Sequence, residues 1–132
     1  MPRIRARSRQ AGRSKYRAVK VSLDGVVFAS KAEGRRYGEL KLLEKAGEIR
    51  GLVLQPHYPL FVKPLLGVMV PIGEYIADFS YEERVRDVKA DLLDTKGWRA
   101  AVEDVKGFRT PLYRWKKKHV EAQYGIQIRE VR

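Results

Sequence analysis

Short runs of partly alternating apolar and polar residues recur along the chain, which is the pattern of half-buried β-strands. The first run, residues 16–30, is interrupted by Asp24-Gly25, the favoured two-residue turn between antiparallel strands, and predicts a β-hairpin. The charged residues 82–97 fit either an extension of a hairpin or a loop. Further strands are predicted at LVLQ (52–55), HYPLFV (57–62), EYIADFSY (74–81), WRAAVEDVK (98–106) and GIQIREV (125–131).

Two stretches change to helical spacing. In the first, Ser30 fits the N-cap, Glu33 the third helical position and Gly47 the C-terminal stop, so a helix is predicted between them. Glu33 lies one turn before Tyr37 and therefore heads the face that we expect to be buried. The apolar stripe of this helix consists of Tyr37, Leu40 and Leu43.

The second predicted helix follows Thr110-Pro111, which fit the N-cap and the first helical position, and extends to Gly125. We expect Trp115 to lie in the core together with Trp98, and His119 to be a core histidine with a hydrogen-bond partner. One side of this helix carries Leu112, Trp115, His119 and Ala122.

The predicted order of elements is hairpin, helix, at least three strands, helix, strand. This order favours an α+β fold in which a mixed β-sheet is flanked by helices. The final strand–helix–strand unit should form a right-handed crossover, so its two strands are expected to be parallel. Residues 16–132 are predicted to form one domain, and residues 1–15 a flexible basic arm that has too few apolar side chains to fold by itself.

The chain has 28 basic and 16 acidic side chains, a formal net charge of +12. Such an excess indicates a polyanionic partner, with nucleic acid as the first candidate. The absence of cysteine excludes a disulfide framework and a thiolate zinc site. No apolar stretch has the length of a signal or membrane segment, so we expect a cytoplasmic protein with no membrane partner.

Three acidic residues occupy positions that point toward the predicted core: Glu33, Asp78 and Asp104. An unpaired buried carboxylate is costly, so acids in such places usually have a cation or a metal as partner. If the three converge, they form an oxygen-rich cup suited to Mg²⁺, with Mn²⁺ able to substitute. Lys106 lies two residues after Asp104 and points to the same side of the strand, where its ammonium can orient a water or stabilise charge on phosphorus.

The series Glu33 in the first helix, Asp78 in a strand and Asp104-Val105-Lys106 in the next strand resembles the PD-(D/E)xK nuclease superfamily. The segments KAEGRRYGELKLLEKAGEI, LQPHYPL, YIADFSY and VEDVKGFRT are more closely similar to small phage-encoded proteins of that superfamily, with further similarity to archaeal-type Holliday-junction resolvases. The motif departs from the common pattern in having Ala77 before the first Asp and Asp104 in place of Glu. The resemblance implies a restriction-endonuclease-like core.

The resemblance also implies roles for individual residues. Glu33, Asp78 and Asp104 would be metal ligands, the Val105 carbonyl a further ligand and Lys106 the catalytic lysine. Gln55 would support these ligands without touching the metal itself.

Each of these residues also has a simpler structural explanation. Glu33 completes the pattern of a capping box with Ser30. Asp104 and Lys106 fit a solvated strand end equally well. Glu103 competes with Asp104 for the ligand position, since a β-bulge would reverse which side chain faces the site, whereas regular alternation favours Asp104.

Together these features predict a metal-dependent, structure-selective DNA endonuclease that resolves Holliday junctions by paired phosphodiester hydrolysis as a homodimer, with no small-molecule cofactor. The alternatives are another endonuclease of the superfamily, of the flap, nicking or transposition type, and a non-catalytic nucleic-acid-binding protein. If the chain is phage-encoded, it acts in the host cytoplasm. The predicted DNA contacts are Arg3, Arg5, Arg7, Arg9, Arg13, Lys15, Arg35, Arg36 and Lys117.

Overall fold

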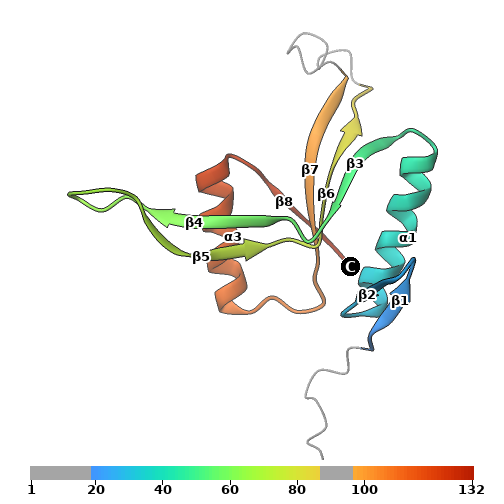
Figure 1. Ribbon diagram of the computed structural model, residues 1–132, viewed down its shortest axis with the longest axis horizontal. Coiled ribbons are helices and arrows are strands. Elements are labelled where there is room, and N and C mark those ends of the chain that lie inside the picture. The colour runs from blue at the N-terminus through green and yellow to red at the C-terminus, as the bar shows by residue number, and fades with distance from the viewer. Residues whose placement is uncertain (1–18, 87–96) are drawn as a thin grey trace, which may run out of the picture.

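The computed structural model describes residues 19–86 and 97–132 and has an α+β fold, as predicted (Figure 1). Within these residues, two helices and eight strands follow one another in the predicted order. The elements are β1 (Val21–Leu23), β2 (Val26–Phe28), α1 (Lys31–Lys45), β3 (Ile49–Leu54), β4 (His57–Val62), β5 (Val70–Ile76), β6 (Phe79–Arg84), β7 (Trp98–Val105), α3 (Pro111–Tyr124) and β8 (Ile128–Val131).

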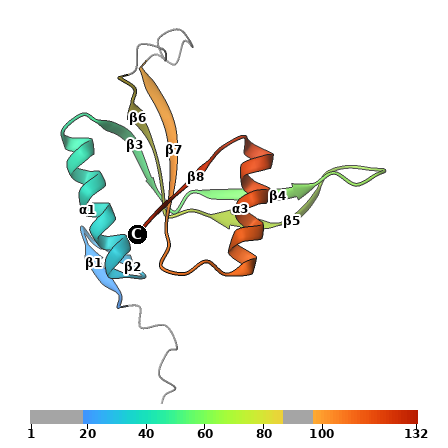
Figure 2. The same ribbon diagram turned by 180° about the vertical axis from the view of Figure 1, so that it is seen from behind.

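A mixed sheet with the strand order β3-β6-β7-β8 forms the centre of the fold. The β6 strand is antiparallel to both β3 and β7, whereas β7 and β8 are parallel and joined by α3, which confirms the predicted parallel pair. The strands β1 and β2 form one separate hairpin, and β4 and β5 form another. Both opposite views place α1 on one side of the central sheet, and α3 with the β4–β5 hairpin on the other (Figures 1 and 2).

The start and end of α1 follow from local sequence signals. The Ser30 hydroxyl accepts a hydrogen bond from the Glu33 N–H at 3.2 Å, which is the predicted N-cap. At the other end Gly47 adopts a positive φ of 77°, and the Glu48 N–H donates to the Leu43 carbonyl at 2.9 Å. This pattern is a Schellman motif, in which glycine is favoured because a left-handed residue must follow the helix.

The segment EYIADFSY does not form one strand, and the prediction of a continuous strand was wrong. β5 ends at Ile76, β6 begins at Phe79, and the break falls at Ala77-Asp78. Opposite this break, Gln55 adopts a left-handed φ of 50° between β3 and β4, and its N–H donates to the Asp78 carbonyl at 2.9 Å. The two-stranded ribbon therefore bends in both strands at once, which turns β4 and β5 out of the central sheet (Figure 1).

Helix α3 buries a different face from the one that its apolar stripe suggested. Tyr113 and Val120 are buried, while Trp115 is 63% exposed, so the prediction that Trp115 lies in the core was wrong. The reason is that α3 packs on the displaced β4–β5 hairpin, which the strand prediction did not anticipate. His119 is half-buried and does not lie in the core, but it has the expected hydrogen-bond partner, with Nε2 2.9 Å from the Phe61 carbonyl oxygen. Trp98 is half-buried under the Arg50 guanidinium, which lies 4.3 Å from the ring centroid.

The central sheet separates two apolar clusters. On the α1 side Tyr37 and Leu40 pack against Phe79, whereas on the α3 side Tyr75 packs with Val120 and other buried residues. Alternation along β7 assigns its side chains to these faces in turn, so adjacent residues contribute to different clusters.

Glu103 lies on the α1 face of β7 and is completely buried. Arg36 on α1 donates to both of its carboxylate oxygens, from Nε at 2.8 Å and from Nη2 at 2.6 Å. The Tyr81 hydroxyl donates a third hydrogen bond. Such a bidentate pair satisfies the carboxylate within the fold, so Glu103 is a structural residue and does not face the Asp104 side.

Replacing Glu103 by alanine should lower the free energy of unfolding by about 3–5 kcal/mol, because it leaves the Arg36 charge without its buried partner. The matched control is Glu39→Ala, which removes the other, exposed carboxylate bonded to Arg36 at 2.8 Å and should cost no more than about 1 kcal/mol. Urea denaturation of both variants measures the difference. Equal losses for the two variants would show that the Arg36–Glu103 pair does not stabilise the fold.

Candidate active site

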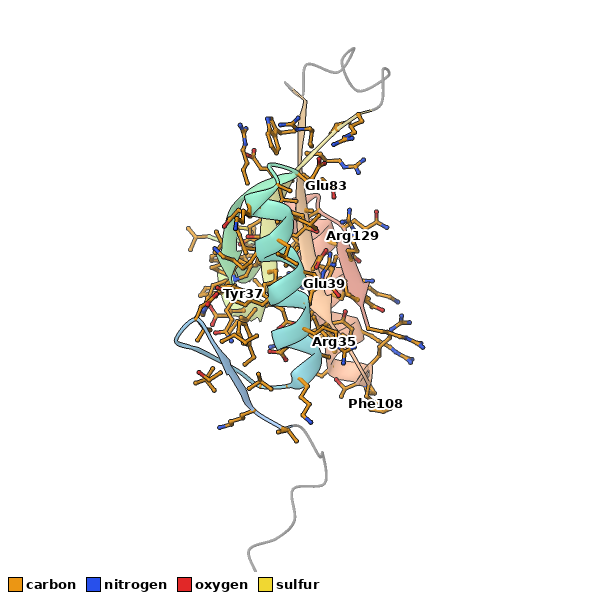
Figure 3. All side chains as sticks on the ribbon, turned by 90° about the vertical axis from the view of Figure 1, so that its right-hand side faces the viewer. Arg35, Tyr37, Glu39, Glu83, Phe108 and Arg129 are labelled. Carbon is orange, nitrogen blue, oxygen red and sulfur yellow. The ribbon has the colours of Figure 1, made fainter. Side chains whose placement is uncertain are left out.

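Asp78, Asp104 and Lys106 lie at the end of β7, and Glu33, near the start of α1, lines a neighbouring pocket with Asp78. Figure 3 shows Arg35, near the start of α1, and Phe108, which follows β7, at the same end of the molecule. Asp78 reaches this end because it occupies the break between β5 and β6, and its N–H donates to the Glu103 carbonyl of β7 at 3.1 Å. The bend in the ribbon thus positions Asp78 beside Asp104.

Asp78 and Asp104 form a pair of interacting carboxyl groups. Asp78 Oδ2 accepts a hydrogen bond from the Val105 N–H at 2.6 Å, which fixes Asp78 against the end of β7. Asp104 is almost completely buried, and its Oδ2 accepts a hydrogen bond from the Tyr75 hydroxyl. Regular alternation along β7 therefore places Asp104 on the site and Glu103 on the opposite face, as the sequence favoured.

The two carboxyl groups cannot both be ionised without cost. Burial, then the hydrogen bond shared with Asp104, and then the negative charges of Asp104 and Glu33 raise the pKa of Asp78 to about 7. The Val105 N–H opposes this shift only in part. A carboxyl pair of this kind holds an extra proton near neutral pH unless a cation takes its place.

One oxygen of this pair has no hydrogen-bond partner. Asp104 Oδ1 is the only buried side-chain oxygen or nitrogen among residues 19–86 and 97–132 without one. The Lys106 ammonium lies 3.1 Å away, close enough for an ion pair, although it is not in the orientation of a hydrogen bond. Lys106 Nζ also lies 4.6 Å from the centroid of the Tyr113 ring, which keeps the ammonium at the rim of the site.

Each acid of the pair lines a different pocket. Asp104 and Lys106 line a pocket of about 300 Å³ together with Tyr75 and Tyr113. Glu33, Gln55 and Asp78 line a smaller pocket of about 90 Å³ with Phe28 and others. A larger hollow of about 580 Å³ lies between β7 and β8, but no acidic residue lines it, so it offers no comparable chemistry.

Glu33 acts on Asp78 through its charge, with no hydrogen bond between them in the part of the chain that the structure describes. Within that same part, no three His, Asp or Glu side chains form a group able to hold a metal ion. The structure therefore brings Asp78, Asp104 and Lys106 into contact, with Glu33 and Gln55 at the neighbouring pocket. The Val105 carbonyl remains a predicted ligand.

The donor chemistry of the pair nevertheless fits a hard divalent cation. Mg²⁺ commonly binds through one or two carboxylates and completes its coordination with water and substrate phosphate, so Asp78 and Asp104 are the residues that would hold it. A cation there would also give the unbonded Asp104 Oδ1 a partner and remove the repulsion between the two carboxylates.

Some of the predicted DNA-contacting side chains already have partners within the protein. Arg35 is exposed on α1, whereas Arg36 is bonded to Glu103 and Glu39, so most of its donors serve the fold. Lys117 Nζ lies 3.3 Å from the Glu130 carboxylate. The predicted contacts from Arg3 to Lys15, and the predicted arm at 1–15 as a whole, lie outside the described residues.

Sequence reasoning did not identify Tyr75 and Tyr113 as neighbours of the site. Tyr75 donates to Asp104, and the Tyr113 hydroxyl donates to Glu130 at 3.1 Å while its ring faces Lys106. The available signal was the alternation in EYIAD, which predicts that Tyr75 and Ala77 point to the same side of that segment. That alternation identifies Tyr75 as a neighbour of the site only if β5 is known to pass beside the end of β7.

The fold and site define an α+β protein with a pair of interacting acids, one of them buried, beside a lysine. The chain belongs to the family described as "Protein of unknown function (DUF1064)", whose model matches residues 13–131. No curated protein and no solved structure gives a match. Neither of the two helices in the described ranges has the length and apolar character needed to cross a membrane.

Replacing Asp78 by asparagine should stabilise the metal-free protein more at pH 8 than at pH 5. An ordinary aspartate has a pKa of 3.8, whereas the pKa of Asp78 in the folded protein is about 7. Protonated Asp78 therefore costs the fold nothing below about pH 4, and its ionisation lowers the free energy of unfolding as pH rises through 7. The gain between the two pH values should be about 1–2 kcal/mol, because partial exposure reduces the full effect.

Thermal unfolding in EDTA at the two pH values measures this gain. The control is Glu82→Gln, which neutralises an exposed acid on β6 and should give the same difference from the unsubstituted protein at both pH values. If Asp78→Asn stabilises the protein equally at both pH values, Asp78 does not have a raised pKa and the repulsion from its acidic neighbours is absent.

Proposed function

We propose that this protein is a metal-dependent, structure-selective DNA endonuclease that resolves four-way junctions by paired phosphodiester hydrolysis. The observation that carries the proposal is the Asp78–Asp104 carboxyl pair, in which Asp104 is buried, with the Lys106 ammonium 3.1 Å from Asp104 Oδ1. A fold stabilised only by its own contacts would gain from apolar residues at these positions. Paired acids beside a lysine are instead suited to holding a cation next to a phosphate.

The proposed roles follow the positions of the side chains. Asp78 and Asp104 would hold Mg²⁺, or Mn²⁺ in its place, with Glu33 and the Val105 carbonyl as further predicted ligands. When bound there, the ion supplies an acidified water and screens the charge of the phosphodiester. Lys106 would orient the attacking water or stabilise the negative charge that develops on the phosphate oxygens. Tyr75 would keep the Asp104 carboxylate in one orientation through its hydrogen bond.

The charge of the chain supports DNA as the substrate. A net charge of +12 favours contacts with phosphates, which give affinity without selecting a sequence. Such contacts suit an enzyme that selects branched DNA by shape. Paired cuts across a junction require two active sites, which a homodimer provides, and we propose the cytoplasm, or a host cytoplasm, as the place of action.

The resemblance of the motif to the PD-(D/E)xK superfamily supports the same class of reaction. In this chain Glu33 lies in α1, Asp78 in the break between β5 and β6, and Asp104-Val105-Lys106 at the end of β7, an order similar to the helix, strand, strand order of that superfamily. The structure adds an independent physical argument, because Asp78 and Asp104 interact although 25 residues separate them in the chain.

With Mg²⁺, the purified protein should cut a labelled four-way junction at paired positions, and EDTA should stop cleavage. Asp78→Asn and Asp104→Asn should each reduce the rate by about 10³-fold or more, since metal ligation contributes several kcal/mol to transition-state stabilisation. The control Glu82→Gln should stay within about twofold of the unsubstituted rate. Denaturing gels of junction, flap, duplex and single-stranded substrates measure all of these.

The same gels separate the alternatives. Cutting of flaps or nicking of duplex in preference to junctions would keep the nuclease class and change the substrate. Junction binding without any metal-dependent cut would leave a non-catalytic nucleic-acid-binding protein. Loss of both binding and cleavage in Asp78→Asn would indicate misfolding, which the unfolding curves of the same sample detect.

A further inference from the structure

The β4–β5 hairpin projects from the body as an arm with an apolar tip. In both opposite views the ribbon leaves the central sheet on the α3 side and extends beyond α3 (Figures 1 and 2). At the tip Leu65 is fully exposed, Leu66 is 87% exposed and Val68 is 84% exposed. The exposed apolar residues of this arm, residues 57–76, are Val62, Leu65, Leu66, Val68, Met69, Val70, Ile72 and Ile76.

The base of the arm is held firmly on α3, so the tip is presented in a defined direction. Gln123 accepts from the Phe61 N–H and donates to the Pro59 carbonyl, both at 2.9 Å. Tyr124 donates to the same Pro59 carbonyl at 2.6 Å, and Lys116 donates to the Glu74 carbonyl at 3.0 Å. These side chains fix both strands of the ribbon, whereas the tip extends away from the rest of the protein.

The amount of exposed apolar surface is large for a chain of this size. Taking roughly 100 Å² for each fully exposed aliphatic side chain, the arm offers on the order of 500 Å², the size at which an exposed patch marks an interaction site. If two arms and two receiving surfaces take part, the buried total passes the roughly 1,000 Å² that a specific interface needs.

The charge of the arm indicates which partner covers it. Apart from His57, the only ionisable side chains of residues 57–76 that carry charge at neutral pH are one Lys and one Glu, Lys63 and Glu74, while the whole chain carries +12. Two copies of so basic a chain repel each other over most of their surfaces. A neutral, apolar projection is the part through which they can approach without that repulsion.

A receiving surface is present on the same chain. Leu112 and Trp115, three residues apart on one face of α3, are 60% and 63% exposed. They lie on the helix that anchors the arm, so a two-fold axis can bring the arm of each copy onto the α3 of the other. This exchange is reciprocal and closes at two copies.

We propose that the β4–β5 arm is the dimerisation element of this protein and packs on the Leu112–Trp115 surface of a second copy. This proposal rests on the proposed function in one respect, because paired cleavage requires two active sites. The choice of contact surface rests on the exposed residues of the arm and of α3. The receiving surface borders the candidate active site, because Leu112 also lines the pocket of Asp104 and Lys106.

The double substitution Leu65→Ser with Leu66→Ser should raise the dimer dissociation constant by about 100-fold or more, because it removes two central apolar anchors. Trp115→Ser should weaken the dimer in the same direction. The matched control is Leu42→Ser, which changes a leucine that is 70% exposed on α1 and should alter the constant less than threefold. Sedimentation velocity over a range of full-length protein concentrations gives these constants, and circular dichroism checks that each variant is folded.

A monomeric unsubstituted protein at about 100 µM would overturn the proposed dimer contact. The same holds if the double variant Leu65→Ser, Leu66→Ser dimerises as well as the control Leu42→Ser. A monomer that instead binds phosphatidylglycerol vesicles through Leu65 and Leu66 would also overturn it, because the arm would then be a lipid contact. Asp78→Asn should dimerise normally. A dimer that cuts no DNA would therefore refute the proposed nuclease function and support the arm as the dimerisation element. Junction cleavage by a monomer would support the nuclease function and refute the dimerisation role of the arm.

Discussion

Two adjacent residues of β7 each bury a carboxylate, and the fold compensates only one of them fully. Glu103 faces α1 and is held by Arg36 and Tyr81, whereas Asp104 faces the other side, next to Asp78. Burying an acid without a complete set of partners is costly, and Asp104 keeps one oxygen without a hydrogen bond although Tyr75 and the Lys106 ammonium are beside it, which is why we propose a bound cation there. The alternation of one strand thus separates a structural ion pair from a candidate metal site across the thickness of the sheet.

The bend of the ribbon at Gln55 and Asp78 links this site to the shape of the molecule. It takes β4 and β5 out of the central sheet, which leaves Asp78 at the sheet end beside Asp104 and directs the apolar arm away from the body. A left-handed non-glycine residue such as Gln55 is unfavourable by itself and persists because surrounding contacts fix it. One local distortion therefore positions both the proposed active site and the proposed dimer contact.

Local signals predicted much of the fold. Ser30, Gly47 and Thr110-Pro111 mark the helix ends because capping depends on neighbouring residues alone. The bend and the packing of α3 depend on contacts between distant segments, so the continuous strand through Asp78 and the buried Trp115 were wrong. At the site, alternation correctly separated Asp104 from Glu103, but Tyr75 could not be found because its neighbour Asp104 belongs to another sheet in the fold.

The most direct test of the account is a crystal structure of the protein soaked with Mn²⁺, with anomalous diffraction collected to locate the ion. The account predicts an anomalous peak between the carboxylates of Asp78 and Asp104, on the side of the sheet opposite Glu103. It also predicts that the peak disappears in Asp104→Asn crystals. A peak at Glu103, or no bound Mn²⁺ at the acid pair at a concentration that saturates other carboxylate sites, would contradict it.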